Sequence, residues 1–219
     1  MRHFDMEIND LKNSLVDMAG LVREMIQSIR DQLVSKNVNF YDKLYALEKE
    51  VNIQEIVIDD KCLKLIALNQ PVGTDLRFIT SAMKINTDLE RMADETISIG
   101  KRIYVNQDIL EDISKMAEIV QQMVEDAIKA FNTSDVELAR AILVKDKNVD
   151  NLKDKVFNHL KHIMINSTDE NEIQKNIDQI TMLRNMQRIG DHATNIGEDV
   201  IFIAYGKDIR HPSAWEDKK

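Results

Sequence analysis

The chain has 219 residues and a formal net charge of −9, from 38 acidic and 29 basic residues. Nucleic-acid backbones are bound by clusters of Lys and Arg, and none stands out in the sequence, so a nucleic-acid partner is not expected. No apolar run approaches the roughly 20 residues of a membrane span, and the N-terminus lacks an apolar signal region, so we expect a cytoplasmic protein. Six Gly and two Pro, beside abundant Leu, Ile, Met, Lys and Glu, predict an all-α fold.

The first half of the chain predicts three long helices separated by short polar breaks. Apolar residues recur three and four positions apart over about 5–35, and similar patterns cover about 38–68 and 75–104. Proline at position 71 forbids helix continuation between the last two, and Thr74 is expected to cap the third helix. Cys62 is the only cysteine, so no internal disulfide is possible, and its apolar surroundings predict a buried core thiol.

The second half repeats this plan. Helices are expected over about 107–131 and 135–165, and a sixth begins near 166–169 and runs to about Tyr205. Ser167 and Glu170 have the spacing of a capping box. Gly206 is expected to end the sixth helix, because glycine adopts the left-handed conformation that closes many helices.

An internal repeat relates the two halves. An offset of 97 residues places Arg91 on Arg188 and Asp94 on Asp191, and upstream an offset of 98 matches similar positions. Short loops between long helices imply antiparallel neighbours, so we expect two tandem three-helix bundles built from six long antiparallel helices. The expected division is a first bundle over 1–105, a second over 106–206 and an irregular tail over 207–219.

Acidic residues converge in the first half. Glu90 and Asp94 are four residues apart on one face of the third helix, and Glu48 and Asn52 have the same spacing on the second. The turn between these helices is centred near residue 71. An antiparallel hairpin therefore places Asp94 opposite Glu48 and Glu90 opposite Asn52.

The second half shows the same coincidence. Asp146 and Asp150 occupy the positions of Glu48 and Asn52, and a turn near 168–169 places Asp191 opposite Asp146 and Gln187 opposite Asp150. Clustered carboxylates raise one another's pKa, attract basic groups or bind a cation. Oxygen ligands favour hard ions such as Mg²⁺, Mn²⁺ or Ca²⁺, with iron also allowed. The alternative is a solvated acidic face with ion pairs from neighbouring arginines.

Other candidates are weaker. His159 and His162 are three apart but have no third ligand nearby, which favours a solvated pair. Glu55 extends the acidic stripe of the second helix, but its repeat counterpart is Lys153, so the duplication does not support it as a ligand. The sequence has no Glu-x-x-His pair, Gly-rich phosphate loop or nucleophile elbow. An enzyme is therefore not expected, although Asp146 and Asp191 offer an acid and a base.

Several runs resemble the PhoU family. They are DLERMAD at 88–94, KDKNVD at 145–150, MQRIGDHATNIGEDV at 186–200, YGKDIRH at 205–211 and the long segment 49–78. The resemblance implies pseudo-twofold symmetry between the bundles. It implies bound metal ions as well, in some cases multinuclear iron or zinc clusters, at Glu90 and Asp94 and at Asp146, Asp150 and Asp191. It also implies a negative regulator of the phosphate-starvation response. Such a regulator couples the ATPase subunit of the phosphate ABC transporter to a sensor histidine kinase, and reaches the membrane only through these partners.

One departure from the family pattern predicts unequal sites. The second motif of the family reads Glu-Arg-Ile-Gly-Asp, whereas this chain has Gln187 at the first position and so loses one negative charge. We therefore expect the Glu90 and Asp94 site to bind metal better. The long helical faces favour a homodimer. Two other functions use the same carboxylates, namely metal storage or buffering and hydrolysis by metal-activated water.

Overall fold

The computed structural model describes residues 3–35, 40–105 and 109–209, and within these ranges it contains six α-helices and no strand. The helices are α1 (His3–Ser35), α2 (Phe40–Asn69), α3 (Gly73–Val105), α4 (Glu111–Thr133), α5 (Val136–Asn166) and α6 (Glu170–Tyr205). The predicted all-α fold is confirmed, and each expected helix is present. The fourth helix begins at Glu111, later than expected, and Ile109 and Leu110 lie in the non-helical segment before it.

Local hydrogen bonds explain where several helices begin and end. Gly206 adopts a left-handed conformation with φ 66°, and its N–H donates to Phe202 O, as predicted for the end of α6. The capping box predicted for Ser167 and Glu170 is wrong: Asp169 caps α6, accepting a hydrogen bond from Asn171 N at 2.9 Å. An ionised carboxylate is a better acceptor at a helix N-terminus than a hydroxyl.

The predicted cap of the third helix is also displaced. The helix α3 begins at Gly73, where φ is 59°, so Thr74 lies in its first turn. The Thr74 hydroxyl accepts a hydrogen bond from Arg77 Nη2 at 3.0 Å. Glycine tolerates a positive φ that Thr74 would adopt only with strain, which explains why the chain turns into the helix at Gly73.

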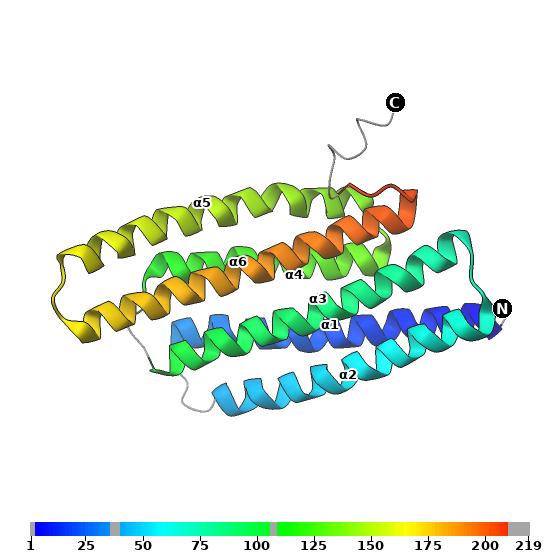
Figure 1. The fold of residues 1–219 in the computed structure, drawn as a ribbon, viewed down its shortest axis with the longest axis horizontal. Helices are drawn as coiled ribbons and strands as arrows, with labels where there is room; N and C mark the ends of the chain where they lie inside the picture. The colour runs from blue at the N-terminus through cyan, green and yellow to red at the C-terminus, as the bar shows by residue number, and fades with distance from the viewer. Residues whose placement is uncertain (1–2, 36–39, 106–108, 210–219) are drawn as a thin grey trace.

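Two antiparallel bundles, α1–α3 and α4–α6, lie side by side and pack against each other mainly through α3 and α6 (Figure 1). The α2–α3 turn and the α5–α6 turn lie at opposite ends of the molecule (Figure 1). The predicted tandem bundles are confirmed by this arrangement.

The contact between α3 and α6 shows the pseudo-twofold relation. Within this contact, His192 Nδ1 lies 2.7 Å from Asp88 Oδ1. An offset of 97 residues exchanges Asp88 with Asn185 and His192 with Glu95. With the Asn185 amide turned to the orientation that satisfies both of its ends, its nitrogen donates to Glu95 Oε2 at 3.3 Å. The second contact is therefore a copy of the first, related by a rotation that exchanges the two helices.

Both bundles share one hydrophobic core. Buried apolar residues from all six helices form a single cluster, and Met92 and Ile189, which the repeat relates, are both buried in it. Cys62 is fully buried, as predicted, and its equivalent in the second bundle, Leu160, is also fully buried. Burial raises the pKa of the Cys62 thiol to about 12.

Two predicted boundaries lie outside the described residues. These are the division between the bundles at 105 and 106, and most of the tail over 207–219. No helix in the described part of the chain combines the length and apolar character that crossing a membrane requires.

Candidate functional site

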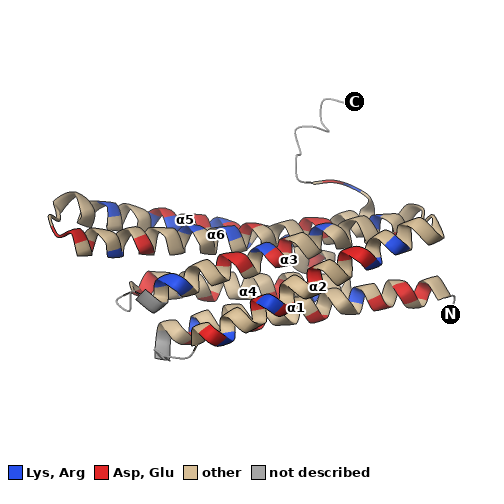
Figure 2. Ribbon diagram, turned by 60° about the horizontal axis from the view of Figure 1, so that its bottom comes forward, with Lys and Arg blue, Asp and Glu red and all other residues tan. Residues whose placement is uncertain are grey.

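Acidic and basic residues both occur along the helices, so any charged site must arise locally (Figure 2). The register between α2 and α3 decides which acids meet. Asn86 Nδ2 donates to Glu55 O at 3.0 Å and to Asp59 Oδ1 at 2.9 Å. Residues of α2 and α3 that lie at equal distances from the turn near residue 71 therefore face each other, as the sequence predicts.

This register forms the first carboxylate patch, which comprises Glu48, Asn52, Glu55, Glu90 and Asp94. Partial burial raises the pKa of Glu90, and the neighbouring charges of Asp94, Glu55 and Glu48 raise it further. The Asn52 amide donates to Glu48 Oε1 at 2.6 Å. The residues predicted from hairpin spacing thus lie together, and Glu55, which the repeat does not support as a ligand, joins them.

The second carboxylate patch comprises Asp146, Asp150, Lys153, Gln187 and Asp191. Gln187 Nε2 donates to Asp150 Oδ1 at 2.6 Å, which confirms that these two residues face each other across α5 and α6. Burial raises the pKa of Asp146, as do the charges of Asp191 and Asp150. Partial burial and the Asp150 charge also raise the pKa of Asp191.

Lys153 distinguishes the two patches. Its Nζ lies 3.5 Å from Asp150 Oδ1 and 3.4 Å from Asp154 Oδ1, and its charge opposes the rise in the pKa of Asp191. The first patch has Glu55 at the equivalent position, 98 residues earlier. An ammonium group therefore supplies counter-charge to the second patch at the point where the first carries another carboxylate.

Neither patch is arranged as a finished metal site. Among the described residues, no three His, Cys, Asp or Glu side chains converge closely enough to hold an ion. Asn52 and Gln187 both present amide N–H groups to carboxylates, and each must turn its oxygen inward to become a ligand. The donors of the first patch suit a hard cation, whereas Lys153 makes the second unsuitable for one. His159 and His162 lie exposed on α5, away from both patches.

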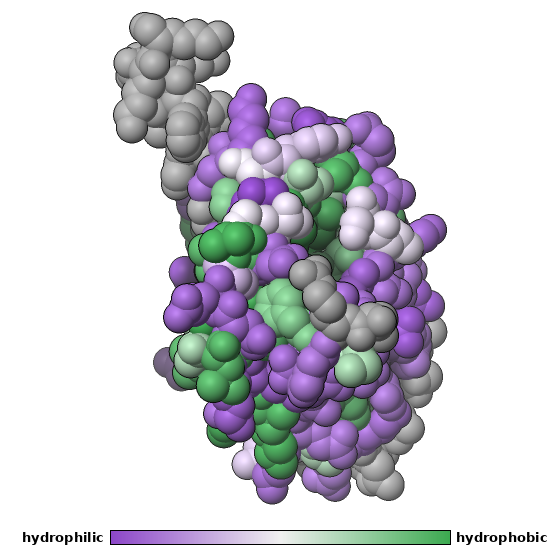
Figure 3. Space-filling view, turned by 90° about the vertical axis from the view of Figure 1, so that its right-hand side faces the viewer, coloured by the Kyte–Doolittle hydropathy of each residue, from purple (hydrophilic) through white to green (hydrophobic). Residues whose placement is uncertain are grey.

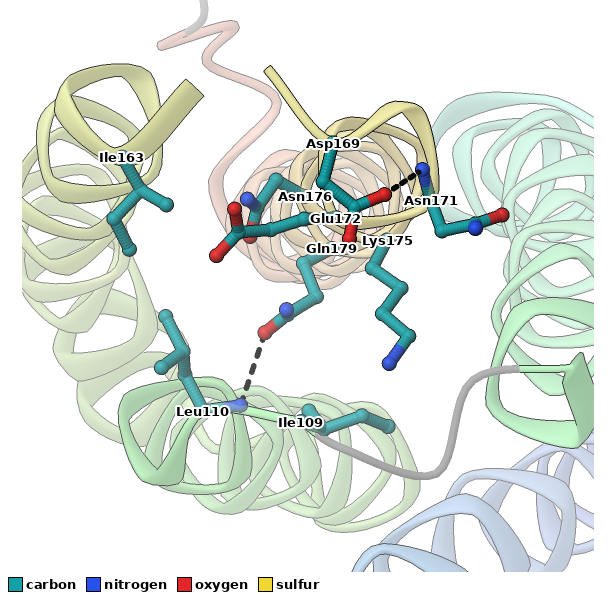
Figure 4. A pocket seen from close by; sticks show the side chains of 9 residues that line it. All are labelled: Ile109, Leu110, Ile163, Asp169, Asn171, Glu172, Lys175, Asn176 and Gln179. Carbon is teal, nitrogen blue, oxygen red and sulfur yellow. Dashed lines mark hydrogen bonds between the residues drawn. The ribbon is translucent and has the colours of Figure 1, made fainter. Parts of the chain in front are cut away.

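A separate cavity of about 460 Å³ lies at the end of the second bundle, between the start of α4 and the α5–α6 turn. Figure 4 shows Gln179 spanning it, with Oε1 accepting from Leu110 N at 2.9 Å. Asn176 Nδ2 is buried there without a hydrogen-bond partner among the described residues. The lining of this cavity carries both Glu172 and Lys175, so its charges do not favour either a cationic or an anionic ligand.

Apolar side chains are exposed on α2 and at the α2–α3 turn. Ile53 and Ile56 are 64% and 69% exposed, and Leu68 and Val72 are each 78% exposed. Figure 3 shows the end of the molecule that carries this turn, where apolar side chains lie between hydrophilic ones. We call these four residues the α2 apolar face. Exposed apolar side chains that form a contiguous patch are typical of protein-binding surfaces.

Comparisons with known proteins agree over nearly the whole chain. A family model described as the PhoU domain matches residues 15–103 and again residues 113–200. A relative from Pseudomonas aeruginosa named "Phosphate-specific transport system accessory protein PhoU homolog" is 32% identical over 216 residues, covering 96% of this chain and 88% of the relative. A relative of the same name from Zymomonas mobilis is 31% identical, covering 99% of this chain and 93% of the relative.

Solved structures show the same fold. The crystal structure of PhoU from Pseudomonas aeruginosa matches with a TM-score of 0.87 and 30% identity, covering 94% of this chain and all of the other. The structure of the phosphate transport system regulatory protein PhoU from Streptococcus pneumoniae has a TM-score of 0.86 at 24% identity, covering 94% of this chain and 99% of the other.

Proposed function

The chain belongs to the PhoU family, and we propose that it is a cytoplasmic accessory protein of a phosphate-specific transport system that represses the phosphate-starvation response when phosphate is plentiful. The observation that carries this proposal is the match of both bundles, across almost the full length of each protein, to relatives named as accessory proteins of that system. In this role the chain is an adaptor without turnover of its own. Its partners are the transporter's ATPase subunit and a sensor histidine kinase.

The α2 apolar face supports a role in binding proteins. Ile53 and Ile56 are one turn apart on the side of α2 that no other described helix covers. Burying two such side chains against a partner contributes roughly 1.5–3 kcal/mol each. The same face can join two copies of the chain, so the proposed homodimer and the proposed partners compete for it.

Association with the transporter tests the proposal. The tagged chain should retain the ATPase subunit from cells grown in high phosphate, and deleting its gene should derepress phosphate-starvation genes. Ile53→Ser with Ile56→Ser should weaken this retention at least about tenfold, the equivalent of 1.4 kcal/mol. Val144→Ser with Ile165→Ser is the matched control, because these α5 residues are 67% and 71% exposed. The proposal is contradicted if both the native chain and the control variant fail to retain the ATPase subunit.

Metal binding is the second part of the proposal. Glu48, Glu90 and Asp94 would hold a divalent or iron ion, with Glu55 and the Asn52 oxygen beside them. The raised pKa of Glu90 supports this, because it reflects burial and then repulsion from neighbouring carboxylates, and a bound cation would offset both. In such a site the ion would fix α2 against α3 and so set the shape of the adjoining α2 apolar face. A high metal stoichiometry without transporter association would instead indicate metal storage.

A further inference from the structure

A groove of about 490 Å³ lies between α3 and α6, and four cationic side chains line it. We call it the basic groove. Lys101 and Arg102 come from α3, and Arg184 and Arg188 come from α6. Two acids, Asp94 and Glu95, also line it, so the groove carries a positive charge in a chain whose net charge is −9. No Lys or Arg cluster stands out in the sequence because two helices from different halves supply these groups.

Two of the guanidinium groups are held in place by neighbours within the groove. Arg188 Nη1 lies 2.8 Å from Oε1 of Glu95, which is itself only 9% exposed. Arg102 Nη1 donates to Ser98 O at 2.7 Å and to Ser98 Oγ at 2.8 Å. Ser98 is neutral, and no acid in the described ranges forms an ion pair with Arg102, so its positive charge is available to a ligand. Groups fixed in this way lose little conformational entropy when they bind a ligand.

The other two cations have no partner among the residues that the structure describes. Lys101 and Arg184 are exposed, and neither makes a hydrogen bond or an ion pair with any described residue. In addition, Arg102 Nε is buried without an acceptor in the described part of the chain. The groove therefore combines two oriented guanidinium groups, two free cations and a donor that lacks an acceptor.

Duplication does not account for the basic groove. An offset of 97 residues relates Lys101 to Glu198 and Arg102 to Asp199, so the α3 cations have acids as their counterparts. The same offset relates Arg184 to Thr87, and only Arg188 keeps its charge, with Arg91 as its counterpart. The positive charge is thus a property of one copy alone. Solubility alone would be served equally well by acidic or basic side chains at these positions, so it does not explain why they are basic.

We propose that the basic groove binds a phosphate-bearing anion, either inorganic phosphate or the phosphoryl groups of a nucleotide. Arginine presents planar pairs of N–H donors that match the oxygens of phosphate, and lysine adds an adaptable point charge. The assignment of an anion follows from the charges in the groove. The choice of phosphate among anions rests on the proposed function, for which a phosphate ligand would report supply directly to the adaptor.

Titration of the purified full-length chain tests the proposal. Inorganic phosphate, ATP and sulfate are titrated separately by calorimetry at equal ionic strength, in the presence of a chelator. The chelator is needed because Asp94 belongs to both the first carboxylate patch and the basic groove, and a bound metal would itself attract phosphate. We expect phosphate or ATP to bind with a dissociation constant below about 1 mM, and sulfate to bind more weakly.

Two matched variants separate the groove from general electrostatic attraction. Lys101→Gln with Arg184→Gln removes two unpaired, exposed cations and should weaken binding at least about tenfold without affecting folding. Lys147→Gln with Lys161→Gln removes the same charge from exposed, unpaired residues of α5 and should leave binding within about twofold. Binding to phosphate alone identifies the free ion as ligand, and binding to ATP alone identifies a nucleotide.

Three results would overturn the proposal: no binding of phosphate or ATP, equal weakening in both double variants, or sulfate binding as tightly as phosphate. The measurement needs no partner protein. A chain that binds phosphate but does not retain the transporter would therefore refute the proposed function alone, and the reverse result would refute the basic groove alone.

Discussion

The two bundles share a backbone plan but differ in how their acidic patches are neutralised. The first patch gathers the carboxylates of Glu48, Glu55, Glu90 and Asp94. The second has three carboxylates, and its fourth and fifth positions are the neutral Gln187 and the cationic Lys153. A cation would relieve the repulsion in the first patch, whereas the second patch already contains the ammonium group of Lys153.

This difference indicates that duplication preserved packing more strictly than charge. Apolar positions correspond between the copies, as Cys62 and Leu160 show, because a core tolerates few changes in volume. Surface charges are individually worth little to stability and can therefore diverge. Divergence left the first patch with one more carboxylate and without a lysine, and it placed the basic groove at only one end of the α3–α6 contact.

The largest expected effect concerns metal affinity. Asp94→Ala should weaken binding of Mn²⁺ or Fe²⁺ at least about 100-fold, because a carboxylate close to a divalent ion contributes several kcal/mol even at an effective dielectric of about 20. Asp191→Ala should change it less than about tenfold, since Lys153 already disfavours an ion there. Elemental analysis after dialysis against limiting metal checks both, with the exposed acid Glu118→Ala as control. Equal losses from the two variants would remove the distinction between the patches.

Much of this arrangement was predictable from the sequence, and the rest was not for identifiable reasons. Helix periodicity and the turn at Pro71 were enough to predict that Glu48 faces Asp94, because an antiparallel hairpin leaves little freedom of register. The sequence does not predict Glu55 as a member of the first patch, because the repeat pairs it with Lys153 and so argues against the acidic stripe of α2. That stripe was the signal that could have found it.

The basic groove was not predictable from local patterns. Lys101 and Arg184 are far apart in the chain, and only the packing of α3 against α6 brings them to one groove. The directions of the Asn52 and Gln187 amides were equally inaccessible, because either end of an amide can satisfy a neighbouring group until the surrounding side chains are placed. Spacing predicts which residues meet, but not which atom each presents.

The next largest effect comes from reversing the charge of Lys153, whose counterpart in the first patch is Glu55. Lys153→Glu places a fourth carboxylate in the second patch and should lower the free energy of unfolding by about 1–2 kcal/mol in the presence of a chelator. Millimolar Mn²⁺ should then recover most of that stability, as a newly formed ion site would. Denaturant unfolding with and without metal measures both quantities. Lys147→Glu, exposed and unpaired on α5, should show neither effect; a similar loss there would mean that net charge alone is responsible.

A smaller effect tests packing beneath the second patch. The first bundle has Ala93 where the second has Gly190, and a β-carbon added at Gly190 would make ordinary contacts with Met123 Cε at 3.7 Å and Asp146 Oδ1 at 3.8 Å. Gly190→Ala should therefore stabilise the protein by about 0.5–1 kcal/mol, the usual gain for alanine over glycine inside a helix. Gly100→Ala is the opposing control, because its β-carbon would lie 2.6 Å from Leu44 Cδ2. Thermal melting should rise for the first variant and fall for the second.

The smallest effect is a pH dependence of the free energy of unfolding, to which we expect the second patch to contribute more than the first. Burial and neighbouring carboxylates raise the pKa values of Asp146 and Asp191 in the second patch and of Glu90 in the first. A carboxyl with a raised folded pKa lowers the free energy of unfolding above that pKa, and the loss disappears as the pH falls through it towards the unfolded value near about 4. With chelator present, lowering the pH from 7.5 to 5 should therefore relieve part of the repulsion.

Asn and Gln substitutions assign this pH dependence to one patch or the other. Asp146→Asn should raise stability at pH 7.5 by about 0.5 kcal/mol and reduce the gain seen on acidification, and Asp191→Asn should do the same. Glu90→Gln should have a smaller effect on the pH dependence, since the second patch holds two groups with a raised pKa, and the charge of Asp191 helps to raise the pKa of Asp146. Melting temperatures at several pH values distinguish these cases. A greater change for Glu90→Gln than for Asp146→Asn would show that the uncompensated charge of the first patch, and not the burial of the second, dominates the electrostatic cost of the duplicated carboxylates.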